Sequence, residues 1–196
     1  MCPYRFMPAC SPHLAARIAR RPIQLRRIGA AFRHLVARHD FVLVEGAGGV
    51  LVPLGGGRNT LDVMRALDLP ALVVARPGLG TLNHTLLTLA ALRTARVPIA
   101  GVLLCTTRPG RRGRVEHDNY QAIAEFGRVE VLGRLPYIST AMDFHRTVER
   151  VSRTWKLRPP FFPSHGTIHA SGFHGLEKPR RGTSANSRPW AGPGRP

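Results

Sequence analysis

Apolar residues follow two alternating patterns through the first 151 residues of the chain. Short continuous runs rich in β-branched residues predict strands that are buried on both faces, as in parallel sheets. These predicted strands are residues 41–45, 70–76, 99–105 and 129–137. Apolar residues at helical spacing predict helices at 14–38 (divided at Pro22), 61–69, 81–97, 115–127 and 139–153. Strands that alternate with helices predict an α/β fold, with a parallel sheet that helices flank on both faces.

Polar and small residues mark several of the expected helix ends. Asn59 or Thr60 can cap the helix that follows them, and Thr81 or Asn83 can cap the next one. Gly127 is expected just beyond the end of its helix, where glycine readily adopts a left-handed backbone.

The texture changes after residue 151. Residues 152–196 are rich in Pro, Gly, Ser, His and Arg and have no apolar period, so too little surface can be buried to offset the ordering entropy. We therefore expect a partial α/β domain at 1–151 and a basic, disordered tail at 152–196.

Cysteine spacing and apolar run lengths narrow the class of protein. The three cysteines form no CxxC pair, which argues against a disulfide framework and a zinc site. The first residues lack the apolar core of a secretory signal, and no apolar run approaches the roughly 20 residues of a membrane span. These features favour a cytoplasmic protein. The net charge of +18 favours phosphate-rich partners, although no nucleic-acid recognition motif accompanies it.

Ligands of parallel α/β sheets bind beyond the carboxyl ends of the strands, so each end is a candidate site. The first predicted strand ends in Glu45, followed by Gly46, Ala47 and Gly48. A carboxylate there suits Mg²⁺ or a metal-bound water, and a loop without bulky side chains can present N–H groups to an anion. The alternative is a glycine-rich turn with an exposed glutamate.

The other strand ends carry weaker signals. The turn at 78–83 suits an anion at a helix N-terminus, or serves only as a helix start. Cys105 at the end of the third strand is typical of a small buried hydrophobe, and residues 136–138 form either a wall against a planar group or an ordinary loop. Ser11 either contacts a ligand or opens a helix whose first residue is proline.

Several stretches in this order and spacing together resemble the dethiobiotin synthetase family, over about residues 3–151. They are SPHLAA, FVLVEGAGGVLVPL, LPALVVARPGLGTLNHTLLTLAALR, IAGVLLC and GRLPY. The resemblance implies a P-loop NTPase-like fold that is incomplete at its N-terminus. It also implies an ATP- and Mg²⁺-dependent ligase of biotin biosynthesis, which carboxylates 7,8-diaminopelargonate with CO₂ and closes the ring to dethiobiotin.

The resemblance assigns roles to particular residues. It makes Glu45 the Mg²⁺ ligand. It also implies a homodimer, because in the family the helix start that corresponds to residues 79–83 holds the substrate carboxylate of the neighbouring subunit. The implied nucleotide-binding residues are Glu45, Gly46, Ala47, Gly48, Cys105, Thr106, Pro136, Tyr137, Ile138 and Asp143. The implied substrate-binding residues are Ser11, Gly80, Thr81, Leu82 and Asn83.

The chain also departs from the family pattern. It contains no G-x-x-x-x-G-K-[ST] motif, whose lysine and hydroxyl hold phosphates and Mg²⁺, and the family's catalytic lysine is absent. Cys105 and Thr106 replace the usual Asn-Asp pair, of which the Asn recognises adenine. We therefore expect no turnover by this chain alone, and a truncated or frameshifted reading frame would account for both ends.

Two alternatives belong to other classes of protein. One is a non-catalytic α/β protein that dimerises through residues 78–92. The other is a basic protein that binds nucleic acid through its arginine-rich tail.

Overall fold

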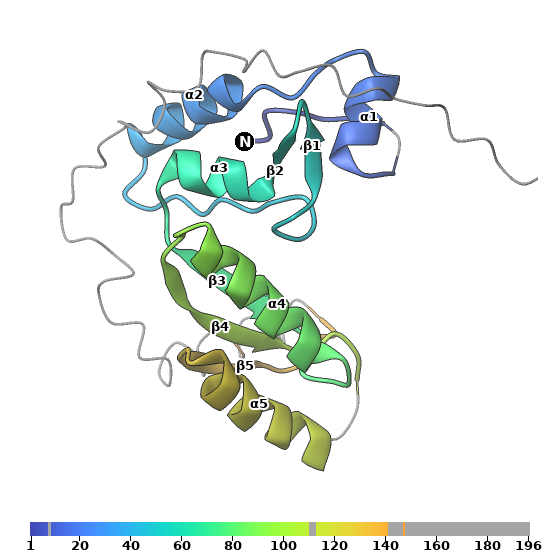
Figure 1. The fold of residues 1–196 in the computed structure, drawn as a ribbon, viewed down its shortest axis with the longest axis vertical. Helices are drawn as coiled ribbons and strands as arrows, with labels where there is room; N and C mark the ends of the chain where they lie inside the picture. Colours follow the sequence, from blue (N-terminus) through green and yellow to red (C-terminus); the bar gives the residue numbers. More distant parts are fainter. Residues whose placement is uncertain (8, 110–112, 141–146, 148–196) are drawn as a thin grey trace, which may run out of the picture.

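The structure is a computed structural model that describes residues 1–7, 9–109, 113–140 and 147. Five helices and five strands lie in the described residues (Figure 1). In chain order they are α1 (Pro12–Ile18), α2 (Leu25–Val36), β1 (Pro53–Gly55), β2 (Arg58–Asn59), α3 (Thr60–Leu67), β3 (Ala71–Ala75), α4 (Thr81–Thr94), β4 (Ile99–Cys105), α5 (Arg114–Gly127) and β5 (Val131–Leu135).

A three-stranded parallel sheet carries the C-terminal half of the described fold. Its strand order is β3-β4-β5, which is also the order along the chain. Val73 aligns with Val102 across β3 and β4, and Leu104 aligns with Arg134 across β4 and β5. Helices α4 and α5 make the two crossovers, so three of the four predicted strands and the predicted parallel α/β class are confirmed.

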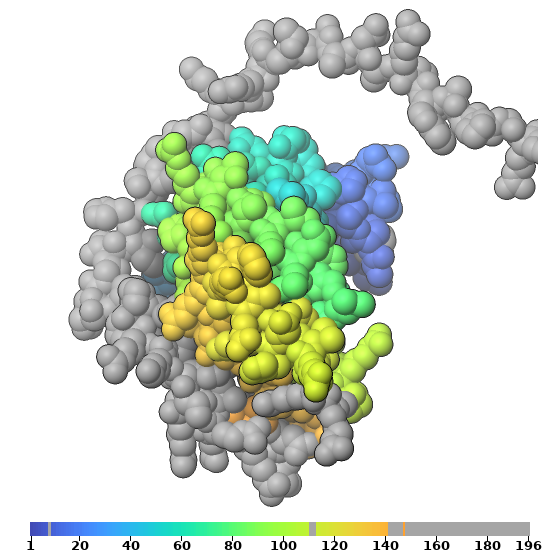
Figure 2. Space-filling view, turned by 60° about the horizontal axis from the view of Figure 1, so that its bottom comes forward, coloured from blue at the N-terminus to red at the C-terminus, as the bar shows by residue number. Residues whose placement is uncertain are grey.

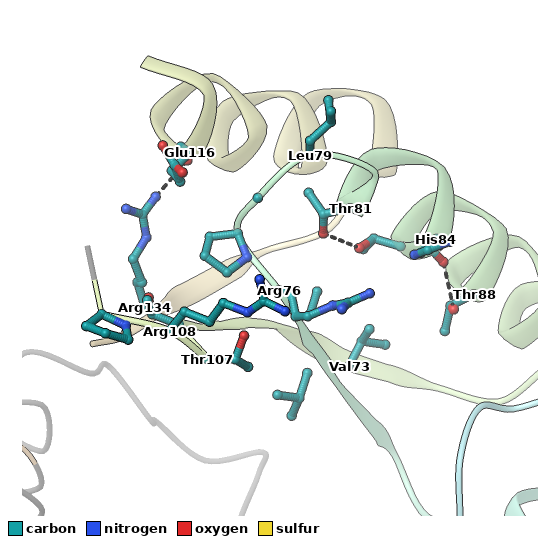
Figure 3. A pocket seen from close by; sticks show the side chains of 17 residues that line it. Val73, Arg76, Leu79, Thr81, His84, Thr88, Thr107, Arg108, Glu116 and Arg134 are labelled. Carbon is teal, nitrogen blue, oxygen red and sulfur yellow. Dashed lines mark hydrogen bonds between the residues drawn. The ribbon is translucent and has the colours of Figure 1, made fainter. Parts of the chain in front are cut away.

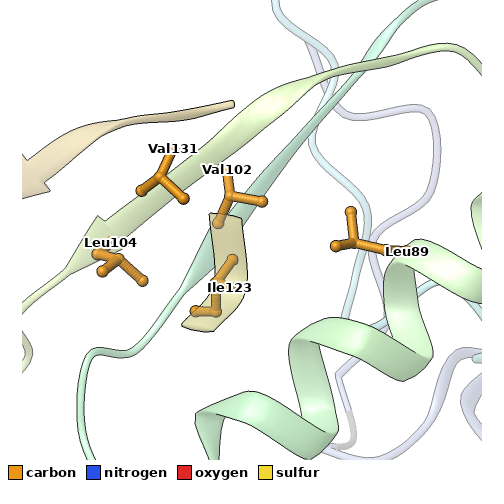
Figure 4. Packing of buried hydrophobic residues seen from close by; sticks show 5 residues of the cluster. All are labelled: Leu89, Val102, Leu104, Ile123 and Val131. Carbon is orange, nitrogen blue, oxygen red and sulfur yellow. The ribbon is translucent and has the colours of Figure 1, made fainter. Parts of the chain in front are cut away.

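The main core lies between this sheet and its two crossover helices. Leu89 of α4, Val102 and Leu104 of β4 and Ile123 of α5 are completely buried, and Val131 of β5 joins them (Figure 4). Burial of each such aliphatic side chain stabilises the fold by about 1.5–3 kcal/mol relative to exposure. This cluster fixes β4 in the centre and thereby the positions at which all three strands end.

The described helices that pack on the sheet cover one face of it. Helices α4 and α5 lie side by side and share the core cluster, which takes Val73 and Ala75 from β3 (Figures 1 and 2). Leu72 and Val74 alternate with those residues and remain 41% and 60% exposed. The expectation of helices on both faces is therefore wrong for the described residues, because consecutive crossovers in one strand order place their helices on one face.

A smaller unit precedes the sheet. It comprises α1, α2, α3 and the short antiparallel β1-β2 hairpin, which was not predicted from the sequence (Figure 1). Helix α1 contacts β1, and α2 contacts α3. Proline 22 falls between α1 and α2, which confirms the predicted division of the first helical stretch.

The predicted strand at 41–45 is the main correction to the fold. Residues 41–46 join no β ladder with any described residue, and Leu43 and Val44 are 75% and 43% exposed. A strand is stabilised by ladder hydrogen bonds and cross-strand packing, and these residues form no such ladder with a described neighbour. Apolar composition alone therefore did not make a strand here.

Two helix ends also differ from expectation. Gly80, with φ of 88°, precedes α4, and neither Thr81 nor Asn83 supplies a side-chain cap. Gly127 is the last residue of α5, and the left-handed residue after it is Arg128, with φ of 44°. The expected cap at Asn59 is confirmed: its Oδ1 accepts from the Asp62 amide, and its own amide donates to Asp62 Oδ2.

Two predictions lie outside the described residues. The helix expected at 139–153 is described only at Thr147, which is helical and buried, and the disordered tail expected at 152–196 is not described. None of the described helices combines the length and apolar character that a membrane crossing requires.

Candidate functional site

A cleft of about 490 Å³ opens at the carboxyl ends of β3 and β4 (Figure 3). The strand ends and the turn after β3 form one wall, the first two turns of α4 form another, and residues from α5 and β5 close one side. The cleft is lined by Val73, Val74, Ala75, Arg76, Pro77, Gly78, Leu79, Thr81, His84, Thr85, Thr88, Thr106, Thr107, Arg108, Pro109, Glu116 and Arg134. This is the edge at which parallel α/β sheets place their ligands.

The turn from β3 into α4 shapes the first wall. Gly80 has a positive φ that favours glycine, and the Thr81 amide donates to the Gly78 carbonyl at 3.2 Å. No acidic residue lies in the first turn of α4, so the positive end of its dipole is not neutralised locally. Thr81 and Thr85 are buried with their Oγ1 atoms 3.3 Å apart.

Helix α5 holds this turn in place through Asn119. Its buried side chain donates from Nδ2 to the Pro77 carbonyl at 2.9 Å and to the Gly78 carbonyl at 3.3 Å. Burial of a side-chain amide destabilises the fold unless the amide is hydrogen-bonded. These two bonds therefore hold α5 against the cleft wall. Sequence reasoning missed this residue, although a lone Asn on the apolar side of a helix was an available signal.

The cleft is rich in cationic and hydroxyl groups. Arg76, Arg108 and Arg134 line it together with His84, against the single carboxylate of Glu116. Arg134 donates from Nη2 to the Glu116 carbonyl at 2.7 Å, and no described residue accepts a hydrogen bond from its buried Nε. This balance of charge favours an anionic ligand such as a phosphate or a carboxylate.

Glu116 is engaged mainly with the start of its own helix. Its Oε2 accepts from the Gly113 amide at 2.8 Å. Hydrogen bonds from the backbone amides of Glu116 and Gly113 lower the pKa of this carboxyl, and the Arg134 charge adds a smaller effect in the same direction. Glu116 is therefore held as a carboxylate that caps the start of α5. It only partly offsets the positive charge of the cleft.

Two of the residues to which the resemblance assigns roles line this cleft, and so do Gly78 and Leu79 of the predicted turn. Thr81 lies at the start of α4, and Thr106 follows β4, where its amide donates to the Leu135 carbonyl at 3.0 Å. Gly80 adjoins the cleft as the residue before α4, but Asn83 is exposed and Leu82 packs against the main core. Cys105 is a half-buried free thiol at the end of β4.

Residues 45–49, here called the glycine loop, lie in the smaller unit and do not line the cleft. Glu45, Ala47 and Gly48 are exposed, and an added Cβ at Gly46 would meet the Thr60 side chain at 3.1 Å. Gly48 has φ of 90°, a conformation that favours glycine. This loop therefore packs beside the start of α3, where the Thr60 and Leu61 amides donate to the Val52 and Val50 carbonyls and the Asp62 amide donates to Asn59 Oδ1.

The remaining predicted residues are dispersed. Ser11 precedes α1 and makes no side-chain cap, although its carbonyl accepts from the Ala15 amide at 3.0 Å. Pro136, Tyr137 and Ile138 follow β5 and do not line the cleft, and Asp143 lies outside the described residues. The assigned roles of all these residues stay predictions.

The described residues do not by themselves form a metal centre. Nowhere in the described ranges do three or more His, Cys, Asp or Glu side chains gather closely enough to hold a metal ion. Mg²⁺ is commonly held by one or two carboxylates together with substrate phosphates, so Glu45 alone fits only a metal that arrives with a nucleotide.

Comparison with known proteins identifies the family. An AAA domain family model matches residues 1–143. An ATP-dependent dethiobiotin synthetase of Anaeromyxobacter dehalogenans (strain 2CP-C) is 47% identical over 137 residues, which are 70% of this chain and 61% of that protein. The enzyme of the same name from Methanococcus vannielii is 35% identical over 151 residues, which are 76% of this chain and 70% of that protein.

A third relative, the ATP-dependent dethiobiotin synthetase of Bacillus cereus (strain G9842), is 38% identical over 137 residues, covering 70% of this chain and 56% of that protein. The chain thus spans about three-fifths of the Anaeromyxobacter and Bacillus relatives. The order of the β3, α4 and β4 segments, the cleft at their ends and these matches lead to one conclusion. The chain belongs to the AAA domain family and, within it, to the dethiobiotin synthetases.

Proposed function

We propose that this chain is the substrate-facing portion of an ATP-dependent dethiobiotin synthetase of biotin biosynthesis. The observation that carries the proposal is the match to enzymes of that name, which extends through the segments that build the cleft. The substrates on this proposal are 7,8-diaminopelargonate, CO₂ and ATP with its Mg²⁺, and the working unit is a homodimer.

The proposed reaction has two group transfers. One amine of the substrate takes up CO₂ as a carbamate, and a carbamate oxygen then attacks the γ-phosphorus of ATP, with ADP as the leaving group. The second amine attacks the carbamate carbon, the ring closes, and phosphate leaves. Such chemistry depends on positioning and charge neutralisation.

The cleft suits an anionic part of these reactants. Thr81 and the uncapped start of α4 can donate hydrogen bonds to a carboxylate or phosphate, while Arg76 and Arg108 supply positive charge. On this proposal Glu45, in the separate glycine loop, would hold the Mg²⁺ that enters with ATP, which would neutralise phosphate charge. On this proposal Thr106 and residues 136–138 would contact the nucleotide base.

Residues 1–196 contain no P-loop motif, which bears on what these residues do alone. Without its lysine and backbone cradle, the γ-phosphate is neither held nor neutralised, so we expect no MgATP-dependent turnover by the isolated chain. We expect turnover in a chimera in which the P-loop segment of the Anaeromyxobacter dehalogenans relative precedes residue 1. The measurement is dethiobiotin formation, with calorimetric titration of MgATP into both proteins.

A single substitution tests the role of Glu45 within that chimera. Glu45→Gln keeps the size of the side chain but removes its charge, and we expect at least a hundredfold loss of kcat, on the order that follows loss of transition-state charge stabilisation. The matched control is Glu125→Gln, an exposed carboxylate on α5 outside the cleft. Equal activity of the two variants would remove Glu45 from the site, and an inactive but well-folded chimera would reject the proposed function.

A further inference from the structure

The N-terminal unit carries a charge distribution that the proposed function does not use. Residues 1–39 contain eight arginines and no Asp or Glu, and the first carboxylate of the chain is Asp40. Helices α1 and α2 and the segment between them carry most of these arginines. Such a one-sided distribution produces a strong positive field over this part of the surface.

Helix α2 separates its apolar and basic sides. Gly29 and Phe32 are buried, and the helix contacts α3, whereas Arg27 and Arg38 are exposed. Arg27 lies in the first turn of α2, and Arg38 lies in the turn that follows the last helical residue, Val36. Arg38 contacts His34 Nδ1 at 2.8 Å through its Nη1.

Tyr4 brings Arg21 close to Arg27. The guanidinium carbons of Arg21 and Arg27 lie 5.4 Å and 5.1 Å from the centre of the Tyr4 ring. The Tyr4 hydroxyl accepts from the Gln24 amide at 2.9 Å, which ties the ring to the start of α2. A guanidinium that stacks on a ring keeps its N–H groups free to donate at its edge.

The carboxylates of the described residues leave these arginines uncompensated. The ion pair found within the described residues joins Arg58 to Asp62, at 4.0 Å, and involves none of Arg21, Arg27 and Arg38. We call these three residues, together with the neighbouring exposed Arg26, the arginine face. It holds several oriented donors for phosphate oxygens and no described acid that would compete with them.

We propose that the arginine face binds the phosphodiester backbone of nucleic acid without sequence preference. Guanidinium groups donate charge-assisted hydrogen bonds to phosphate oxygens, and binding gains free energy by releasing condensed counterions. A membrane surface matches less well. A helix that binds a bilayer inserts a free apolar side, whereas the apolar side of α2 is already packed in the fold.

The test uses the full chain and a fluorescently labelled DNA duplex of mixed sequence. Fluorescence anisotropy gives Kd at salt concentrations from about 50 to 200 mM, over which phosphate contacts show a strong salt dependence. The test variant is Arg21→Gln, Arg27→Gln and Arg38→Gln together. The matched control is Arg65→Gln, Arg96→Gln and Arg128→Gln, three exposed arginines on other parts of the fold.

Both triple variants lower the net charge equally, from +18 to +15 (18 − 3). For the test variant we expect at least a tenfold weaker Kd at low salt, and a log–log salt slope that is shallower by up to about 2.7, or 0.9 for each lost contact. We expect the control to stay within about threefold of the parent. A version with lysine at the three test positions keeps the charge, so binding close to that of the parent separates lost contacts from lost folding.

Three results would overturn the proposal. Equal weakening of the two glutamine variants would reduce the effect to overall charge. No weakening of either would place any binding elsewhere, including residues 152–196, which every variant retains. Binding to vesicles of anionic phospholipid but not to the duplex would identify a membrane surface instead. None of these results bears on dethiobiotin formation, because the arginine face does not line the cleft.

Discussion

At the scale of single residues, Gly127 lies at the predicted helix end, but the reason for a glycine there differs from the predicted one. Gly127 occurs at the end of α5, yet its backbone is helical, and the left-handed conformation falls on Arg128. The glycine is required by packing instead, because a Cβ there would lie 2.9 Å from Leu89 Cδ1 and 3.2 Å from Val129 Cγ1. The chain signals a small residue at this position, but only the approach of α4 to α5 explains it.

We expect Gly127→Ala to lower the free energy of unfolding by about 1–3 kcal/mol, the usual cost of overpacking a core. Urea denaturation followed by circular dichroism measures this change. Gly49→Ala is the control, since nothing lies within 4 Å of the added Cβ and the backbone has no positive φ. A Gly127→Ala protein as stable as the control would show that α4 and α5 do not approach this closely.

At the scale of elements, capping chemistry predicted one helix start and failed at another. Asn59 and Asp62 exchange hydrogen bonds at the start of α3, as the pattern of the chain indicates. Helix α4 begins after Gly80 with no side-chain cap, although Thr81 and Asn83 were available. The turn from β3 is instead held from outside by Asn119 of α5, so a distant element determines how this helix begins.

We expect Asn59→Ala to destabilise the protein by about 1 kcal/mol, because the Asp62 amide loses its acceptor. Asn83→Ala, on the exposed side of α4 and outside any cap, should change stability by less than about 0.5 kcal/mol. Thermal unfolding of the two variants gives the comparison. Similar losses from both would show that the α3 cap adds nothing to stability.

At the scale of the whole molecule, the two faces of the sheet differ. Residues 102 and 104 of β4 face α4 and α5 and are completely buried, whereas Leu72 and Val74 of β3 point to the opposite face and are exposed. On that opposite face Leu103 of β4, which aligns with Val74, is only 5% exposed, so the open part of the face is its β3 side. Strands β3 and β4 are therefore similar in apolar composition but differ in burial. Composition along a strand predicts burial on both faces, but the described helices supply it on one.

We expect Leu104→Ala to cost about 2–5 kcal/mol, as for other large-to-small changes in a core. Val74→Ala should cost less than about 0.5 kcal/mol, because its side chain is 60% exposed. Guanidinium unfolding of both variants measures the difference. A cost above 1 kcal/mol at Val74 would mean that this face is covered in solution, by a second copy or another segment.

The candidate site was predictable only in part. The rule that ligands bind at carboxyl strand ends indicates the region in which Thr81 and Thr106 line the cleft. Glu116, Asn119 and Arg134 escaped notice because they follow the turn between β3 and α4 by more than 30 residues along the chain. Glu45 also follows an apolar run, at 41–44, but that run forms no β ladder with the described sheet.

The amino-acid sequence by itself determined the alternation of helices and strands, the parallel α/β class, the cap at Asn59 and the family, because periodicity and motifs are local properties. The tertiary structure decided which apolar runs became strands, which face of the sheet the helices cover and which side chains share the cleft. Those outcomes depend on partners that lie far apart in the chain. A run such as 41–45 can carry all the preferences of a strand and still require a neighbour to pair with it.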